Sequence, residues 1–183
     1  MQETQLYKDP VKADSIIYRR ISPRTFIDKD IRDSDLMVLF EAARWAASCF
    51  NEQPWSFIYA SRTNQDTYEK LLSCLSENNK RWASKAPVLM LTVVKTYFEK
   101  DLSKNKHALH DLGLAMGNFS YQATKLGISI HQMAGFNYQM AHDLLNLPEN
   151  HEPVTMVAIG YSKEQKLDRS RKPIEEFVFN RAL

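Results

Sequence analysis

Residues 87–94 read Pro87-Val88-Leu89-Met90-Leu91-Thr92-Val93-Val94, an almost continuous apolar run that follows a proline. A run of this kind is typical of a central strand that is buried on both faces, because apolar side chains point to each side of it. We therefore expect this segment to lie inside a sheet that carries helices on both faces.

Helical periodicity occurs on either side of this expected strand. Before it, apolar residues at Leu36, Leu39 and Ala43 follow Asp33 and Ser34, either of which can cap a helix. After it, residues 103–126 place apolar side chains at helical spacing, at Leu109, Leu112, Ala115, Met116, Phe119 and Ala123. We expect a helix in each place.

The long second helix contains two glycines and is followed by a third. Gly113 and Gly117 lie four residues apart, although a glycine costs about 1 kcal/mol inside a helix. We therefore expect another helix or backbone to approach closely there. Gly127 is expected to end the helix in the left-handed conformation.

The remaining elements alternate irregularly along the chain. Helices are expected at residues 11–19, 65–75 and 138–145, and strands at 56–60, 128–131 and 154–159. This order indicates the α+β class, built as three layers. No repeat, low-complexity tract or linker is present, so residues 1–183 form one expected domain. The apolar residues of 173–179 are expected to dock on another element or another subunit.

Composition limits the partners and the compartment. The chain has 24 Lys and Arg against 22 Asp and Glu, a balance that argues against general binding of nucleic acid. No stretch approaches the ~20 apolar residues of a membrane span, and the N-terminus lacks the pattern of a secretory signal. With only Cys49 and Cys74, structural disulfides are not expected. We expect a cytoplasmic protein with neither nucleic-acid nor membrane partners.

Two basic segments could bind a phosphate. Arg20-Ile21-Ser22-Pro23-Arg24 places two guanidinium groups and a hydroxyl on a turn that proline constrains, which suits charge-assisted bonds to a phosphate. Arg169-Ser170-Arg171-Lys172-Pro173 is a second cluster, remote in sequence. Either cluster could instead be a solvated surface.

Two further segments could contact a planar ligand. Ser48, Asn51 and Gln53 offer donors and acceptors for the polar edge of a heteroaromatic ring, although a helix C-cap and a turn would also explain part of this segment. Gln132-Met133-Ala134-Gly135-Phe136 follows a short expected strand, and its glycine permits close backbone approach or a positive φ. A plain turn between strand and helix explains it equally well.

Together these segments resemble the nitroreductase family of flavoproteins, over about residues 16–179. That family has an Arg-x-Ser-x-Arg turn, which Arg20, Ser22 and Arg24 match. It also has a helix that ends Ala-Arg-Trp-Ala-Pro-Ser-Ser-x-Asn-x-Gln-Pro-Trp. The corresponding segment here reads Ala43-Arg44-Trp45-Ala46-Ala47-Ser48-Cys49-Phe50-Asn51-Glu52-Gln53-Pro54-Trp55, with Ala47 and Cys49 as departures. Asn79 and Trp82, the turn at His131-Gln132-Met133-Ala134-Gly135, and Arg169 and Arg171 follow in the family's order.

The resemblance implies a nitroreductase-like fold with a mixed central sheet, and a homodimer whose C-terminal arm wraps the partner subunit. FMN would bind at the interface, contacted by both subunits. The implied cofactor-binding residues are Arg20, Ile21, Ser22, Arg24, Ser48, Cys49, Phe50, Asn51, Gln53, Asn79, Gln132, Met133, Gly135, Arg169 and Arg171.

Within this set the resemblance also implies a division of roles. Arg20, Ser22 and Arg24 would hold the phosphate, the ribityl chain and the ring edge, and Arg169 and Arg171 would join them. Residues 48–53 would reach the FMN of the other subunit. Residues 132–135 would line the ring, and Asn79 would touch the ring or the substrate.

The implied activity is transfer of hydride from NAD(P)H through FMN to a nitroaromatic, quinone or enone, in a ping-pong scheme. Such chemistry needs no catalytic side chain, and none is assigned. A related flavin enzyme that dehalogenates, fragments the flavin or oxidises heterocycles is one alternative, and a flavin-binding dimer with little turnover is another. His107, His110 and Asp111 could face one way on the long helix, but a solvated face is expected there rather than a metal site.

Overall fold

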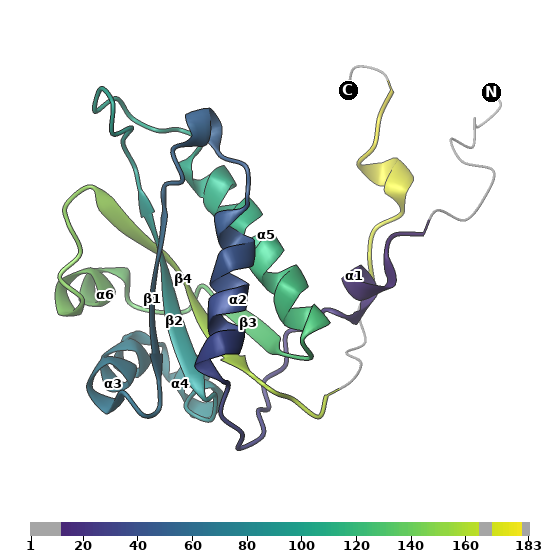
Figure 1. The fold of residues 1–183 in the computed structure, drawn as a ribbon, viewed down its shortest axis with the longest axis vertical. Helices are drawn as coiled ribbons and strands as arrows, with labels where there is room; N and C mark the ends of the chain where they lie inside the picture. Colours follow the sequence, from purple (N-terminus) through teal and green to yellow (C-terminus); the bar gives the residue numbers. More distant parts are fainter. Residues whose placement is uncertain (1–11, 165–169, 181–183) are drawn as a thin grey trace.

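The computed structural model describes residues 12–164 and 170–180, and in them a four-stranded sheet lies between two layers of helices (Figure 1). The strands are β1 (Trp55–Ser61), β2 (Val88–Lys95), β3 (Ser129–Met133) and β4 (His151–Gly160), in the spatial order β1-β2-β4-β3. All three pairings are antiparallel. The α+β class and the three layers are confirmed. The expectation of a mixed sheet was wrong for the described residues, because each neighbouring pair of strands runs in opposite directions.

The expected central strand is β2, and its residues from Val88 to Val94 are all buried. Its side chains alternate between two separate cores, with Val88, Met90 and Val94 on one face and Leu89, Leu91 and Val93 on the other. The pairing with β4 shifts register between Thr92 and Val93. At this shift the Thr92 hydroxyl links the two strands, because it donates to the Thr155 carbonyl (3.1 Å) and accepts from the Thr155 amide (3.0 Å).

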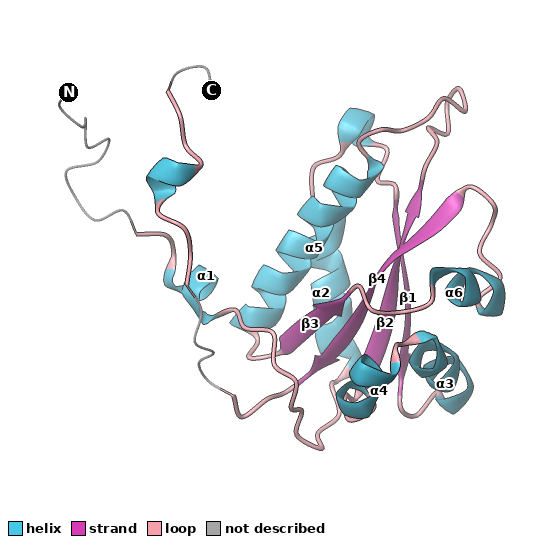
Figure 2. Cartoon of the chain, turned by 180° about the vertical axis from the view of Figure 1, so that it is seen from behind, coloured by secondary structure: helices cyan, strands magenta, loops and turns pink. Residues whose placement is uncertain are grey.

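The two cores are closed by two different sets of helices (Figure 2). On one face lie α2 (Asp33–Arg44) and α5 (Ala108–Lys125), which bury Leu39 and Phe119. On the other face lie α3 (Gln65–Cys74), α4 (Glu77–Ala83) and α6 (Tyr138–Leu144). The short helix α4 was not predicted, because its sequence is polar except at Trp82 and Ala83.

The long helix α5 buries the expected residues from Leu112 to Ala123, but Leu109 is 60% exposed. The helix begins at Ala108, later than expected, because the residues before it make other hydrogen bonds. Lys104 pairs with Tyr97, and the Asn105 side chain accepts a hydrogen bond from the His107 amide (3.0 Å). Gly127 follows the helix with φ +71°, which confirms the expected left-handed ending.

Two helix starts also differ from expectation. Neither Asp33 nor Ser34 caps α2; the N-cap is Arg32, whose guanidinium instead pairs with the Asp35 carboxylate (2.9 Å). The first helix, α1, covers Ser15–Arg19, and Asp14 sets its start by accepting a hydrogen bond from the Ile16 amide (2.9 Å). Both starts depend on side-chain contacts that apolar spacing does not encode.

The C-terminal segment, residues 170–180, lies beside α1 and away from the sheet in both views (Figures 1 and 2). It contains the short helix η2 (Ile174–Glu176), and its Phe177 and Phe179 side chains are exposed. That this segment docks on a partner subunit stays a prediction.

Candidate functional site

A cavity of about 570 Å³ lies where α1, α5, β3 and the C-terminal segment meet. It brings together three of the predicted site residues from distant parts of the chain, namely Arg20, Gln132 and Arg171. Arg20 and Arg171 place two guanidinium groups in its wall, and none of the described residues that line it is acidic. Such a charge arrangement favours an anionic ligand.

The rest of the wall is mostly apolar or lacks side chains. Tyr18, Met116 and Tyr121 line it together with Gly113 and Gly117 of α5. Among the described residues, and apart from the neighbouring backbone of α5 itself, no heavy atom lies within 4 Å of the position that a Cβ would take at either glycine. The close neighbour that we expected at these glycines is therefore absent from the described residues, and the glycines widen the cavity instead.

The turn that carries Arg20 is fixed by contacts to the sheet. Arg20 Nη1 donates to Ser22 Oγ (3.0 Å), and the side chains of Ile21 and Pro23 are buried. The Pro23 carbonyl accepts a hydrogen bond from His131 Nδ1 (2.9 Å). Arg24 lies on the exposed side of the turn. The turn therefore presents Arg20 to the cavity, whereas the Ile21 side chain belongs to the core.

His131 is itself held by packing against an aromatic side chain. Its ring lies 4.5 Å from the ring of Trp82, between centroids, and Trp82 stacks in turn against Phe26. Because a carbonyl can only accept, Nδ1 of His131 carries the proton in the hydrogen bond to Pro23.

The Gly135 turn shows the close approach that the sequence suggested. Its carbonyl accepts two hydrogen bonds of 3.0 Å, one from Asn79 Nδ2 and one from the Ser76 amide. A Cβ on Gly135 would lie 2.7 Å from Asn79 Nδ2 and 3.0 Å from Ser76 Oγ. Asn79 is thus engaged in holding this turn.

Gln132 and Met133 point to opposite sides of β3. Gln132 lines the cavity, whereas Met133 is 3% exposed and packs in the core beneath α3 and α4. Only the backbone of Met133 is therefore available to a ligand in the cavity. This alternation follows directly from the strand.

The predicted polar segment after α2, residues 48–53, forms a strained loop that we call the 48–53 loop. Phe50, Asn51 and Gln53 have φ of 53°, 59° and 51°, although none is a glycine. Within the loop, Ser48 Oγ accepts from the Gln53 amide (3.0 Å) and Gln53 Nε2 donates to the Asn51 carbonyl (3.1 Å). Left-handed backbone at bulky residues is uncommon and is concentrated at functional sites. A plain C-cap and turn would not require it.

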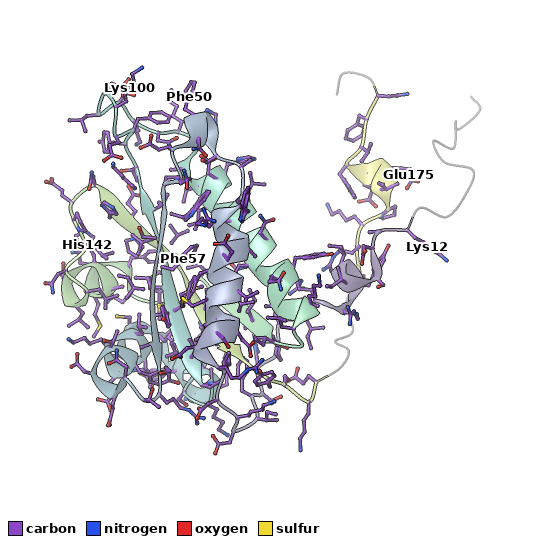
Figure 3. All side chains as sticks on the ribbon, viewed as in Figure 1. Lys12, Phe50, Phe57, Lys100, His142 and Glu175 are labelled. Carbon is purple, nitrogen blue, oxygen red and sulfur yellow. The ribbon has the colours of Figure 1, made fainter. Side chains whose placement is uncertain are left out.

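The 48–53 loop does not border the cavity. It lies at the end of the molecule where α5 begins, and the Cys49 amide donates to the Asp111 carboxylate on the first turn of that helix (2.9 Å). Phe50, labelled in Figure 3, is 89% exposed there, and its ring edge contacts Phe98. A single chain therefore contains two separate groups of predicted site residues.

The two arginines of the C-terminal basic segment, and Arg44 of α2, are placed differently with respect to the cavity. Arg169 lies outside the described residues. Arg171 lines the cavity and also donates to the Ser170 carbonyl (2.8 Å). Arg44 pairs with Glu41 (2.6 Å), and its guanidinium, together with Trp45, lowers the pKa of Glu41 to about 2. Arg44 therefore belongs to a surface ion pair rather than to the cavity.

Sequence reasoning missed three residues that the structure makes prominent. Tyr18 and Tyr121 line the cavity, and Tyr121 could have been found because it follows Gly117 by one helical turn. Asp111 was expected on a solvated face of the helix, and that expectation was wrong, because Asp111 is 2% exposed. Among the described residues no group of three His, Cys, Asp or Glu side chains could hold a metal ion. In the same part of the chain, no helix has the length and apolar character needed to cross a bilayer.

Comparisons with known proteins agree on one family. A family model described as the nitroreductase family matches residues 17–161. A protein of Archaeoglobus fulgidus named "Putative NADH dehydrogenase/NAD(P)H nitroreductase" is 27% identical over 157 residues, covering 82% of this chain and 86% of that protein. A similarly named protein of Streptomyces coelicolor is 30% identical over 132 residues, covering 62% of this chain and 64% of its own length.

Solved structures show the same similarity in three dimensions. A crystal structure described as an oxidoreductase containing FMN superposes with a TM-score of 0.87 at 25% identity, covering 98% of this chain and 97% of that one. A nitroreductase family protein from Streptococcus pneumoniae superposes with a TM-score of 0.77 at 22% identity, covering 91% and 98% of the two chains.

The close contacts at Gly135 predict different outcomes for two glycine-to-alanine changes. Gly135→Ala should lower the free energy of unfolding by about 1–2 kcal/mol, because the new Cβ displaces Asn79 from the Gly135 carbonyl. Gly117→Ala adds a methyl group to open space within a helix, so it should stabilise by about 0.5–1 kcal/mol. Urea unfolding followed by circular dichroism measures both. Equal effects of the two changes would contradict this account of the turn.

Proposed function

The chain belongs to the nitroreductase family, and from that premise we propose that it is an FMN-dependent oxidoreductase that transfers hydride from NAD(P)H to a second small molecule. The relatives named as NAD(P)H nitroreductases and the FMN-containing structure support this proposal. The observation that carries it is the cavity that Arg20 and Arg171 border together.

The residues around the cavity fit FMN in charge and in shape. Two guanidinium groups match a phosphate, which Arg binds through short charge-assisted hydrogen bonds. Apolar and aromatic side chains with a bare helix backbone suit a flat ring, and about 570 Å³ lies in the usual range of small-molecule sites. Gln132 adds a donor and an acceptor that can reach a polar ring edge.

Within this site the chain's own residues bind and orient. Arg20 and Arg171 hold the phosphate, and the Ser22 hydroxyl fixes the guanidinium of Arg20. Asn79 holds the Gly135 turn so that its backbone stays close to the ring. When bound, FMN would supply the group that accepts the hydride from NAD(P)H and passes it to the second small molecule. NAD(P)H and the acceptor use the same space in turn, which is a ping-pong order.

We further propose that the active form is a homodimer in which the 48–53 loop of one copy meets the cavity of the other. The loop and the cavity lie at different places along α5 of one chain, so a single copy offers them separately. The exposed surface of α5 carries Leu109, Leu114 and Tyr121, and Trp45 and Phe50 are exposed near its start. A second copy would cover this apolar surface.

The dimer is tested by introducing a charge on α5. Light scattering should give twice the 21.2 kDa of the chain for the unaltered protein. Leu114→Glu should shift this mass towards the monomer, because a carboxylate would be buried in the interface. Leu144→Glu is the matched control, since it alters a similarly exposed leucine on α6 across the sheet. A monomeric unaltered protein would refute the proposal.

The function is tested by its cofactor and its turnover. The purified protein should be yellow, release FMN on denaturation, and oxidise NADH or NADPH when a quinone, an enone or a nitroaromatic is supplied. Flavin without turnover on any of these acceptors would instead indicate a binding protein or a related flavin reaction. A colourless protein that takes up no added FMN would refute the proposal.

We also propose a cytoplasmic location, which the two free thiols at Cys49 and Cys74 support. Cell fractionation would test it.

The phosphate contact is tested at Arg20. Arg20→Ala should raise the dissociation constant of FMN about ten- to hundredfold, because a charged hydrogen bond contributes about 1.5–3 kcal/mol. Arg44→Ala removes a guanidinium that forms an ion pair with Glu41 and does not line the cavity. It should therefore change this dissociation constant less than twofold. Fluorescence titration of the flavin-free protein measures both variants. Equal losses would show that overall charge, rather than the cavity, governs binding.

A further inference from the structure

Asp111 is a buried carboxylate at the start of α5. It is 2% exposed, and it lies on the first turn of the helix, where the helix dipole favours a negative charge. A carboxylate in an apolar core is costly unless hydrogen bonds compensate for the lost water. Its one close hydrogen bond among the described residues comes from the backbone amide of Cys49, which donates to Oδ2 (2.9 Å) from 62 positions away in sequence.

The other polar neighbour of Asp111 is weaker. His110 Nδ1 lies 3.4 Å from Oδ1, and the His110 side chain is largely exposed. A hydrogen bond to a shielded carboxylate is stronger than one in water, because the surroundings screen it less. The contact between Asp111 and the Cys49 amide is therefore the firm attachment of this carboxylate.

Cys49 is the residue at which the strained backbone begins. Phe50, Asn51 and Gln53 follow it with positive φ, a conformation that persists only where the surroundings enforce it. The hydrogen bonds that side chains make inside the loop are exposed to solvent, as is the bond from the Glu99 amide to the Glu52 carboxylate (2.7 Å). Asp111 thus provides the shielded anchor of the loop.

We propose that Asp111 is a positioning residue of the flavin site. Its carboxylate holds the Cys49 amide and so keeps the 48–53 loop in the shape in which Ser48, Asn51 and Gln53 meet FMN. Asp111 does not touch the cofactor; it acts through the loop. This inference rests on the function proposed above, because it concerns the affinity of the same site for FMN.

Three substitutions separate the hydrogen bond from the bulk of the side chain. Asp111→Ala removes the acceptor and leaves a space, whereas Asp111→Leu removes the acceptor but keeps the space filled. Asp111→Asn retains a carbonyl oxygen that can accept from the Cys49 amide. Thr92→Val is the matched control: it removes a buried hydroxyl from the sheet, away from the loop, together with its two hydrogen bonds to Thr155.

The measurement is a fluorescence titration of each flavin-free protein with FMN, after circular dichroism has shown that the variant is folded. Asp111→Ala and Asp111→Leu should raise the dissociation constant at least fivefold, and Asp111→Asn should stay within threefold of the unaltered protein. Thr92→Val should stay within twofold even if its thermal midpoint falls. Hydrogen exchange should be faster across residues 48–53 in Asp111→Leu than in Asp111→Asn.

The outcomes distinguish this inference from the proposed function. An unaltered protein that binds no FMN refutes the proposed function and the inference with it. If that protein binds FMN and Asp111→Leu changes the affinity less than fivefold, the inference alone fails. The inference also fails if Asp111→Asn binds FMN as weakly as Asp111→Leu does. It fails too if Thr92→Val loses as much affinity for FMN as Asp111→Leu. If Asp111→Ala does not fold, the comparison of Asp111→Leu with Asp111→Asn tests the inference.

Discussion

A strand with no exposed face is stable only if helices cover both of its sides, and β2 imposes that condition on this chain. Its side chains enter two cores in alternation, so α2 and α5 must close one face while α3, α4 and α6 close the other. The helix α5 consequently has a fixed position relative to the sheet. Its buried side completes a core, and its other side forms a wall of the cavity. The site therefore inherits its geometry from the packing of β2.

Much of this arrangement could be predicted from the sequence, because apolar spacing reports burial directly. Residues 88–94 are buried as that spacing predicts, and so are Leu112, Ala115, Met116, Phe119 and Ala123. The failures have physical causes that spacing does not contain. The cap of α2 and the start of α5 depend on individual side-chain bonds, and α4 is held by two apolar residues in a polar sequence. Strand direction depends on the path of the connections, so the antiparallel sheet could not be inferred from composition.

The site shows the same division between local and long-range information. The sequence marked Arg20, Gln132 and Arg171 separately, and only the fold shows that they border one cavity. The sequence indicated the polar side chains of the 48–53 loop but not the left-handed conformation of its backbone. The positive φ at Phe50 and Gln53 is imposed by contacts rather than by glycine. The sequence also did not indicate that Met133 points into the opposite core. Residue type predicts which chemistry is present, and tertiary contacts determine which atoms are presented.

The two glycines of α5 have a consequence for how this protein can change. At Gly113 and Gly117 the cavity wall is bare backbone with open space in front of it, whereas Ala115 and Phe119 on the buried side are fully packed. A larger residue at either glycine would narrow the cavity without entering the core. The selectivity of the site can therefore drift, or be redesigned, without disturbing the packed core, because the cavity wall and the core lie on opposite faces of one helix.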